Sequence, residues 1–245
     1  MSIITSYPLR DTFAGVYQLQ AMSTFPTGDS SPSGIGDSLK IVNGWMASTI
    51  LDTDPLTATG QRAEIQAAPD PNSERWYSWK MMIPLDWNDS ADMTLMQIHD
   101  TPDGGDLSRA PNFVLSTWGG WLRYTIPAAT LPAESTAGLT YSAGQLIKGH
   151  VYECCLHVNW QPNGFGFREL FIDKVPIFRQ YNVGTHYVDV VGPYFKLGVY
   201  NHGHVSNFGT RTAYYRDVVI RSGNDGYQAA LGGLPTTEET MTFSL

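Results

Sequence analysis

The residues best able to do chemistry lie in one nine-residue stretch, residues 194–202, with the sequence YFKLGVYNH. In a β-strand, successive side chains point to opposite faces. One face of this stretch would then carry polar and ionisable side chains, namely Tyr194, Lys196, Tyr200 and His202. The other face would carry apolar side chains suited to a core, namely Phe195, Leu197 and Val199. Phenol, amine and imidazole groups on one face can contact an extended polymer and exchange protons with it. The alternative is an amphipathic strand whose outer face is merely aromatic and basic.

Two further segments repeat this arrangement. Residues 97–99 (QIH) place Gln97 and His99 on one face and Ile98 toward a core. Residues 62–65 (RAEI) place Arg62 and Glu64 on one face, with apolar residues behind them. We therefore predict that three strands line one concave groove. Its polar residues would be Arg62, Glu64, Gln97, His99, Lys196, Tyr200 and His202.

The three segments, in this order and approximate spacing, resemble the signature segments of jelly-roll polysaccharide lyases. These are the alginate lyases and their glucuronan-lyase and heparin-lyase relatives, and the resemblance runs from about residue 35 to about residue 222. It implies an all-β jelly roll, a two-sheet concanavalin-like sandwich with a concave substrate groove. It also implies cleavage of a uronic-acid-containing polysaccharide by β-elimination. By motif position, the catalytic residues would be Arg62, Gln97, His99 and Tyr200.

β-Elimination asks three things of these residues. The uronate carboxylate must be neutralised so that charge can spread into it, a task that suits the Gln97 amide and the Arg62 guanidinium. His99, with an ordinary pKa of about 6.5, can take the C5 proton. Tyr200, with an ordinary pKa of about 10, can protonate the glycosidic oxygen, and Lys196 is a candidate cation for lowering that pKa. In some of the lyases that it resembles the tyrosine is both base and acid, so the choice of base stays open.

Further residues are predicted to contact the substrate, namely Lys196, Glu64, Tyr194, His202 and Arg123. Most of them have a structural alternative. For Glu64 we favour a structural salt bridge with Arg62, and Lys196 could be a solvated strand lysine. Tyr194 suits a wall or a sugar-stacking surface better than an acid. His202 stands where many alginate lyases have glutamine.

The sequence departs from the alginate-lyase pattern at Gln66, where those enzymes usually have a second arginine. Residues 76–87, 111–113 and 215–217 look closer to the heparin-lyase and glucuronan-lyase branch. A heparin-type substrate would need many sulfate contacts, which a chain of net charge −8 with few arginines supplies poorly. We therefore predict a non-sulfated uronate polymer, alginate- or glucuronan-like.

Composition limits the possible partners. The 245 residues can form one large all-β domain. The charge of −8 argues against nucleic acid, and the absence of an apolar run of about 18 residues argues against a membrane span. An anionic polysaccharide would meet a local basic groove drawn from Arg62, Arg123, Arg168, Lys196 and Arg211. No cofactor is predicted, and no metal-ligand spacing is present. A glycoside hydrolase generally needs two carboxylates in its groove, and the sequence indicates no such pair, which argues against that class of enzyme.

Cys154 and Cys155 are neighbours in a strand pattern and should point to opposite faces as free thiols, which fits a reducing compartment. The N-terminus does not resemble a secretory signal. We expect the protein to act on the polymer outside the cell, either as part of a virion or after release by lysis. The alternative function is a non-catalytic carbohydrate-binding or bacteriophage virion structural protein on the same jelly roll.

The elements that must position these residues are almost all strands. Residues 38–42 would open the series and residues 76–84 alternate clearly. Hairpins are predicted across residues 112–126 and 150–173, a third begins at Asp173-Lys174, and residues 214–220 form the last clear strand. We predict an N-terminal arm at 1–35, a jelly roll at 36–222 and a C-terminal tail at 223–245.

Overall fold

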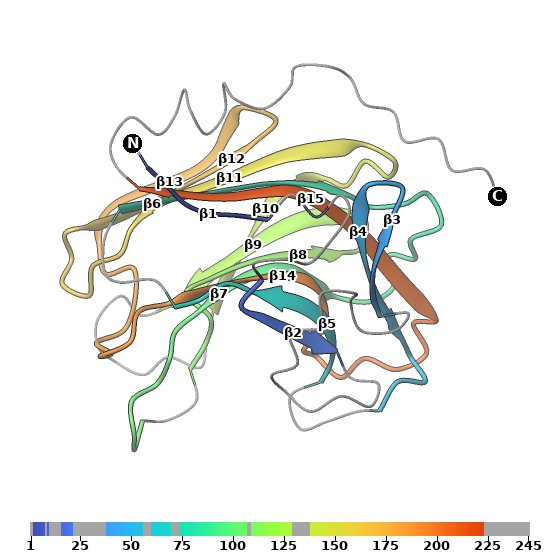
Figure 1. The fold of residues 1–245 in the computed structure, drawn as a ribbon, viewed down its shortest axis with the longest axis horizontal. Helices are drawn as coiled ribbons and strands as arrows, with labels where there is room; N and C mark the ends of the chain where they lie inside the picture. Colours follow the sequence, from blue (N-terminus) through green and yellow to red (C-terminus); the bar gives the residue numbers. More distant parts are fainter. Residues whose placement is uncertain are drawn as a thin grey trace.

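Two antiparallel sheets stack face to face in the protein (Figure 1). The computed structural model describes residues 2–7, 9, 16–21, 38–55, 60–69, 74–106, 109–128 and 138–222. These residues form fifteen strands and no helix, so none of them belongs to a helix that could cross a membrane. The predicted all-β jelly roll is confirmed.

The upper sheet in Figure 1 has eight strands. Seven follow the order β13 (Val175–Val183), β12 (Gly166–Ile172), β11 (Val151–Asn159), β6 (Glu74–Met82), β15 (Thr210–Ser222), β4 (Trp45–Leu51) and β3 (Leu39–Val42). The eighth, β1 (Ser2–Tyr7), pairs with β15. The structure thus contains the strands predicted near residues 38–42, 76–84 and 214–220.

The lower sheet has seven strands and carries all three segments singled out in the sequence. Its order is β10 (Gly138–Gln145), β9 (Trp121–Pro127), β8 (Phe113–Trp118), β7 (Met93–His99), β14 (Tyr194–Asn201), β5 (Gln61–Gln66) and β2 (Gln18–Ala21). Because β14 lies between β7 and β5, segments far apart in the sequence become direct neighbours.

The N-terminal segment contributes to both sheets. β1 pairs with β15 in the upper sheet, and β2 pairs with β5 in the lower sheet. Two stretches of the predicted arm are therefore strands of the sandwich. Residues 22–37, which include the predicted end of the arm, and the predicted tail at 223–245 lie outside the described residues, so the domain boundaries stay predictions.

The predicted hairpins form with the expected turn chemistry. Gly119 and Gly120 connect β8 to β9 with φ of 60° and 80°. Asp173 and Lys174 connect β12 to β13 with φ of 51° and 66°. Positive φ at both central residues is typical of a type I′ turn, whose twist matches that of the paired strands. These turns fix the register of the strands beside them.

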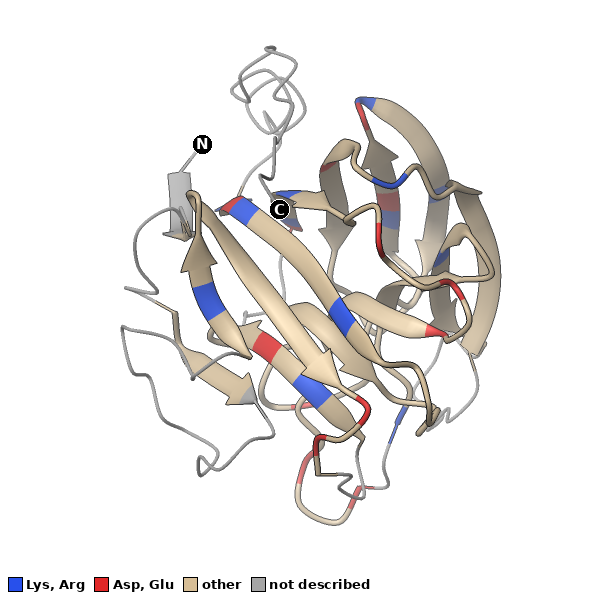
Figure 2. Ribbon diagram, turned by 90° about the vertical axis from the view of Figure 1, so that its right-hand side faces the viewer, with Lys and Arg blue, Asp and Glu red and all other residues tan. Residues whose placement is uncertain are grey.

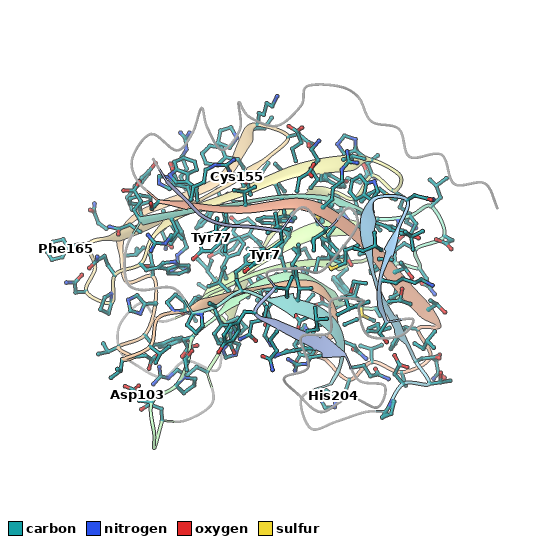
Figure 3. The ribbon with its side chains drawn as sticks, in the orientation of Figure 1. Tyr7, Tyr77, Asp103, Cys155, Phe165 and His204 are labelled. Carbon is teal, nitrogen blue, oxygen red and sulfur yellow. The ribbon has the colours of Figure 1, made fainter. Side chains whose placement is uncertain are left out.

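The core lies between the sheets and includes the apolar faces of the site strands. Phe195, Leu197 and Val199 are each at most 1% exposed, as predicted for the reverse face of β14. Tyr77, labelled between the sheets in Figure 3, stacks on Phe195 with ring centres 5.5 Å apart. Packing of these side chains holds β14 firmly, with its polar face turned away from the core.

The two cysteines confirm the strand alternation of β11. Both are buried free thiols. Cys154 belongs to the core between the sheets, whereas Cys155 packs with Trp76 and Phe171 on the other side of the upper sheet (Figure 3). Burial raises the pKa of both thiols, so they are protonated and unreactive at neutral pH.

Candidate active site

The outward face of β5, β7 and β14 forms a groove with a volume of about 670 Å³. Its lining includes the predicted residues Arg62, Gln97, His99, Tyr194, Lys196, Tyr200 and His202. His204, labelled on the lower side of the molecule in Figure 3, lines it as well. Residues that the sequence did not single out extend the groove over β7 to β10, namely Thr94, Val114, Ser116, Thr125 and Thr140. The predicted site strands therefore do converge on one groove.

Strand register pairs the polar residues across the groove floor. Tyr194 is the partner of His99, and their rings lie 5.8 Å apart. Tyr200 is the partner of Arg62, whose guanidinium carbon lies 4.2 Å from the centre of the phenol ring. Direct cross-strand partners bring their side chains together on one face of a sheet. Each tyrosine of β14 is thus held beside a different functional group.

Glu64 lies beneath the groove rather than on its surface. Its side chain is fully buried and accepts a 2.7 Å hydrogen bond from Nε2 of Gln97. Nη1 of Arg62 lies 3.5 Å, and Nζ of Lys196 3.7 Å, from its second carboxylate oxygen. Glu64 does not line the groove, so this placement supports the favoured structural salt bridge and not substrate contact. One buried carboxylate thus holds three donors that line the groove.

Gly198 allows β14 to approach β5 closely beside Glu64, its partner in the sheet. Its φ of +147° is rarely adopted by residues with a side chain, and a Cβ there would lie 2.0 Å from the carbonyl oxygen of Ala63. Position 198 therefore requires glycine. A side chain there would force β14 away from the backbone of β5, the strand that carries Arg62 and Glu64.

Gln20 also contacts the two cations, Arg62 and Lys196, and sequence reasoning missed it. Its Oε1 accepts hydrogen bonds from Nζ of Lys196 at 2.6 Å and from Nη1 of Arg62 at 3.4 Å. Its Nε2 donates to Oε1 of Gln66 at 2.9 Å. Gln66, which replaces the arginine of the alginate-lyase pattern, thus orients Gln20 on the edge strand. The only sequence signal was the polar alternation of residues 18–20, QLQ.

His99 is arranged to present an unprotonated ring nitrogen. Its Nδ1 lies 2.9 Å from the carbonyl oxygen of Asp100, which can only accept, so Nδ1 carries the hydrogen. Nε2 then has the free lone pair. Burial lowers the pKa of His99, and the positive charge of Lys196 lowers it further. The neutral imidazole is therefore the dominant form at neutral pH.

Tyr200 keeps its proton. Burial raises the pKa of Tyr200, and the charge of Arg62 opposes this shift without cancelling it. The prediction that a nearby lysine would lower this pKa is wrong, because the cation against the ring is Arg62 and burial has the larger effect. Burial likewise raises the pKa of Tyr194 to about 12. A protonated phenol suits a proton donor rather than a base.

The family model described as polysaccharide lyase matches residues 31–219. The chain belongs to this family. No curated protein sequence matches it.

Solved structures share the fold of this lyase. The endo-β-1,4-glucuronan lyase from the fungus Trichoderma reesei has a TM-score of 0.71 at 16% identity, covering 91% of this chain and 96% of that one. An alginate lyase of polysaccharide lyase family 7 has a TM-score of 0.67 at 15% identity, covering 89% and 99%. An alginate lyase from Pseudomonas aeruginosa has a TM-score of 0.62 at 15% identity, covering 85% and 98%. At such identities the likeness shows a common fold.

Three arginines of the predicted basic groove do not line it, namely Arg123, Arg168 and Arg211. Arg123 lies on the groove side of the lower sheet, because its partner Ser116 lines the groove, but it is not itself in the lining. Arg168 and Arg211 are buried and donate to backbone carbonyl oxygens, so they do not belong to the predicted basic groove. Figure 2 shows basic residues as separate positions on several strands, with acidic residues among them.

Arg109 is a groove residue that the sequence did not reveal. It lines the groove and binds three carboxylates, donating to Asp100 at 3.1 Å, to Asp189 at 2.7 Å and to Asp106. Burial raises the pKa of Asp100 and Asp189. Asp106 and Asp189, with Asp103 (labelled in Figure 3), form the described group of carboxylates able to approach one metal ion. Arg109 already supplies positive charge at this position.

The remaining predicted contact residue, His202, lies just beyond the end of β14. Its Nδ1 is 3.3 Å from the hydroxyl of Thr94, and its ring centre is 5.9 Å from that of Tyr200. It lines the groove and is exposed. The structure therefore places His202 in the wall of the groove, next to the phenol of Tyr200.

Proposed function

We propose that this lyase cleaves a non-sulfated uronate polysaccharide, alginate- or glucuronan-like, by β-elimination. The observation that carries the proposal is the convergence of Arg62, Gln97, His99 and Tyr200 in one groove. A guanidinium, an amide, a neutral imidazole and a protonated phenol are the groups that this reaction requires.

The first step is neutralisation of the uronate carboxylate. Gln97 uses one amide hydrogen on Glu64 and has a second to donate to the substrate. Arg62 offers a planar fork that matches a carboxylate, and Lys196 adds a second positive charge beside it. Because Glu64 and Gln20 fix these donors in advance, they stabilise the developing charge without having to reorganise.

The proton transfers follow from the protonation states. Nε2 of neutral His99 takes the C5 proton, the electrons of the C5–H bond form the C4–C5 double bond, and the C4–O bond breaks. Tyr200 gives its proton to the departing glycosidic oxygen. A raised pKa makes Tyr200 a poor base at neutral pH, and a lowered pKa keeps His99 available. These directions favour His99 as base and Tyr200 as acid.

The spacing of the two groups limits where the reacting sugar can lie. Tyr200 is the sheet partner of Thr94, and the backbone of Thr94 is about 16 Å from that of His99 along β7. Both side chains can act on one sugar only if the sugar lies between them. Base and acid on opposite sides of the ring suit guluronate, whose C5 hydrogen and C4 oxygen are trans, whereas in mannuronate and glucuronate these two atoms lie on the same side.

The test is ultraviolet absorbance by the new C4–C5 double bond. Purified protein is offered alginate, glucuronan, hyaluronan and heparin separately. We expect absorbance to grow with alginate or glucuronan, and to be abolished by Tyr200→Phe and by His99→Ala. No growth with any polymer, together with tight retention on one of them, would contradict turnover and identify a binding protein. Extracellular action and virion association stay predictions.

A further inference from the structure

Two tryptophans are exposed at the tip of the β8–β9 hairpin. Trp118 is 54% and Trp121 49% exposed, although most large apolar side chains in the described residues are buried. The two residues are cross-strand partners on either side of Gly119 and Gly120. Exposure of two neighbouring indoles to water is unfavourable in free energy, and such exposed aromatic pairs are typical of binding surfaces.

The tryptophans lie on the groove side of the lower sheet. Ser116 lines the groove, and its partner is Arg123. Side chains two residues apart along a strand share a face, so Trp118 lies on the face of Ser116 and Trp121 on that of Arg123. On β10, Gln145 is the partner of Trp121 and Ser142 that of Arg123. We call this surface the hairpin platform, made of Trp118, Trp121, Arg123, Ser142 and Gln145.

The hairpin platform is continuous with the groove. Asp92 lines the groove and lies 3.9 Å from Nη1 of Arg123. The guanidinium carbon of Arg123 lies 5.0 Å from the centre of a Trp118 ring. Arg123 thus links Asp92 in the groove wall to the indole of Trp118. From the register, Trp118 lies about 7 Å along the strand direction and two strands, about 10 Å, across from Tyr200.

The platform is held in place before any ligand binds. The amide of Gly119 donates to the carbonyl oxygen of Asp89 at 3.1 Å, and the carbonyl oxygen of Gly120 accepts from the amide of Leu146 at 2.9 Å. Both glycines have positive φ, which suits the tight turn. A surface ordered in advance loses little conformational entropy on binding.

We propose that the hairpin platform binds sugar rings of the same polysaccharide, beyond the position of cleavage and on the side of Tyr200. This inference rests on the proposed function, since it names where the substrate chain continues. Each indole offers an apolar face to the C–H face of a sugar ring. Arg123 offers a cation to a uronate carboxylate, with the polar side chains of β10 beside it for hydroxyl groups. Long chains would reach the platform, and short ones would not.

The test compares long and short substrates in platform variants. Trp118→Ala, Trp121→Ala and the double variant are assayed on the polymer that gives turnover and on short oligosaccharides of that polymer. We expect the double variant to raise KM for the polymer by about tenfold with kcat unchanged, and to leave KM for the short substrates unchanged. Phe165→Ala is the matched control. Phe165 is 77% exposed at the tip of another hairpin (Figure 3), and its loss should change neither KM.

Other outcomes overturn the proposal. Equal loss on long and short substrates would mean that the tryptophans act through the structure of the groove. No change on the polymer would mean that it does not touch them. If no polymer is cleaved, the wild-type protein and the double variant are run in gels containing each polymer. Retardation of the wild-type protein that the double variant loses would support the platform although elimination had failed. Identical mobility in every gel would refute the platform.

Discussion

Each face of the sandwich carries a histidine among aromatic and acidic residues, but the two histidines are bonded differently. On the outer face of the upper sheet, His157 stacks on Trp76 at 3.5 Å between ring centres. Its Nδ1 bonds to Glu169 at 2.8 Å and its Nε2 to Glu74 at 2.7 Å. In the groove, the Nδ1 of His99 bonds to a backbone carbonyl and the ring faces the cavity.

The difference teaches that the bonding of a histidine, more than its neighbours' residue types, indicates its role. With both nitrogens bound to carboxylates of β6 and β12, His157 links three strands and leaves neither nitrogen available to a substrate. His99 has one nitrogen fixed and the other available, the arrangement that a general base requires. The outer cluster is built for stability and the groove for proton transfer.

The largest effect expected is on activity, from the same substitution on the two faces. His99→Gln should lower kcat about a thousandfold, because a positioned general base contributes roughly 100-fold to 10,000-fold. His157→Gln should leave kcat within about twofold, since the outer face does not contact the groove. Initial rates of ultraviolet absorbance on the responsive polymer measure both. Similar losses of kcat in the two variants would contradict the different roles that we assign to the two histidines.

A stability measurement completes the pair. His157→Gln should lower the free energy of unfolding by about 1–3 kcal/mol, because glutamine cannot satisfy both carboxylates in the same geometry. Urea denaturation followed by tryptophan fluorescence reports this change. An unaltered unfolding midpoint would show that the outer cluster does not stabilise the protein.

The buried carboxylate under the groove gives the next largest effect. Glu64→Gln keeps an acceptor for Gln97 but removes the charge shared by Arg62 and Lys196, so the donors lose their fixed positions. We expect kcat/KM to fall about tenfold to a hundredfold. Glu169→Gln on the outer face is the matched control. It also removes a carboxylate bound to a histidine, and it should lower thermal stability with kcat/KM unchanged.

The pH dependence is a smaller test of the same division of roles. Activity needs His99 neutral, and its lowered pKa places the acidic limb of kcat/KM below about pH 6.5. Activity also needs Tyr200 protonated, and its raised pKa places the alkaline limb above about pH 10. A profile of kcat/KM should therefore be flat between these values. A rate that climbs steadily from neutral to alkaline pH would instead identify Tyr200 as the base.

Much of the fold and of the groove could be predicted because the signals are local. The two-residue alternation in β5, β7 and β14 already separates polar from core-facing side chains, and the glycine turn predicts the β8–β9 hairpin. Contacts set by strand order could not be predicted. Gln20 reaches Lys196 because β2 pairs with β5, and Arg62 rather than Lys196 faces Tyr200 because of register. Arg109 comes from a segment without strand alternation, so no periodic signal marked it.

The most direct test of the central claim is the source of the oxygen atoms in the products. The responsive polymer is cleaved in water enriched in heavy oxygen, and the oligosaccharides are weighed by mass spectrometry. Elimination breaks the C4–O bond without adding water, so at early times, before the new reducing ends exchange their anomeric oxygen with water, we predict products that carry no heavy oxygen and one double bond per cleavage. Incorporation of one heavy oxygen atom per cleavage would show hydrolysis and contradict the account.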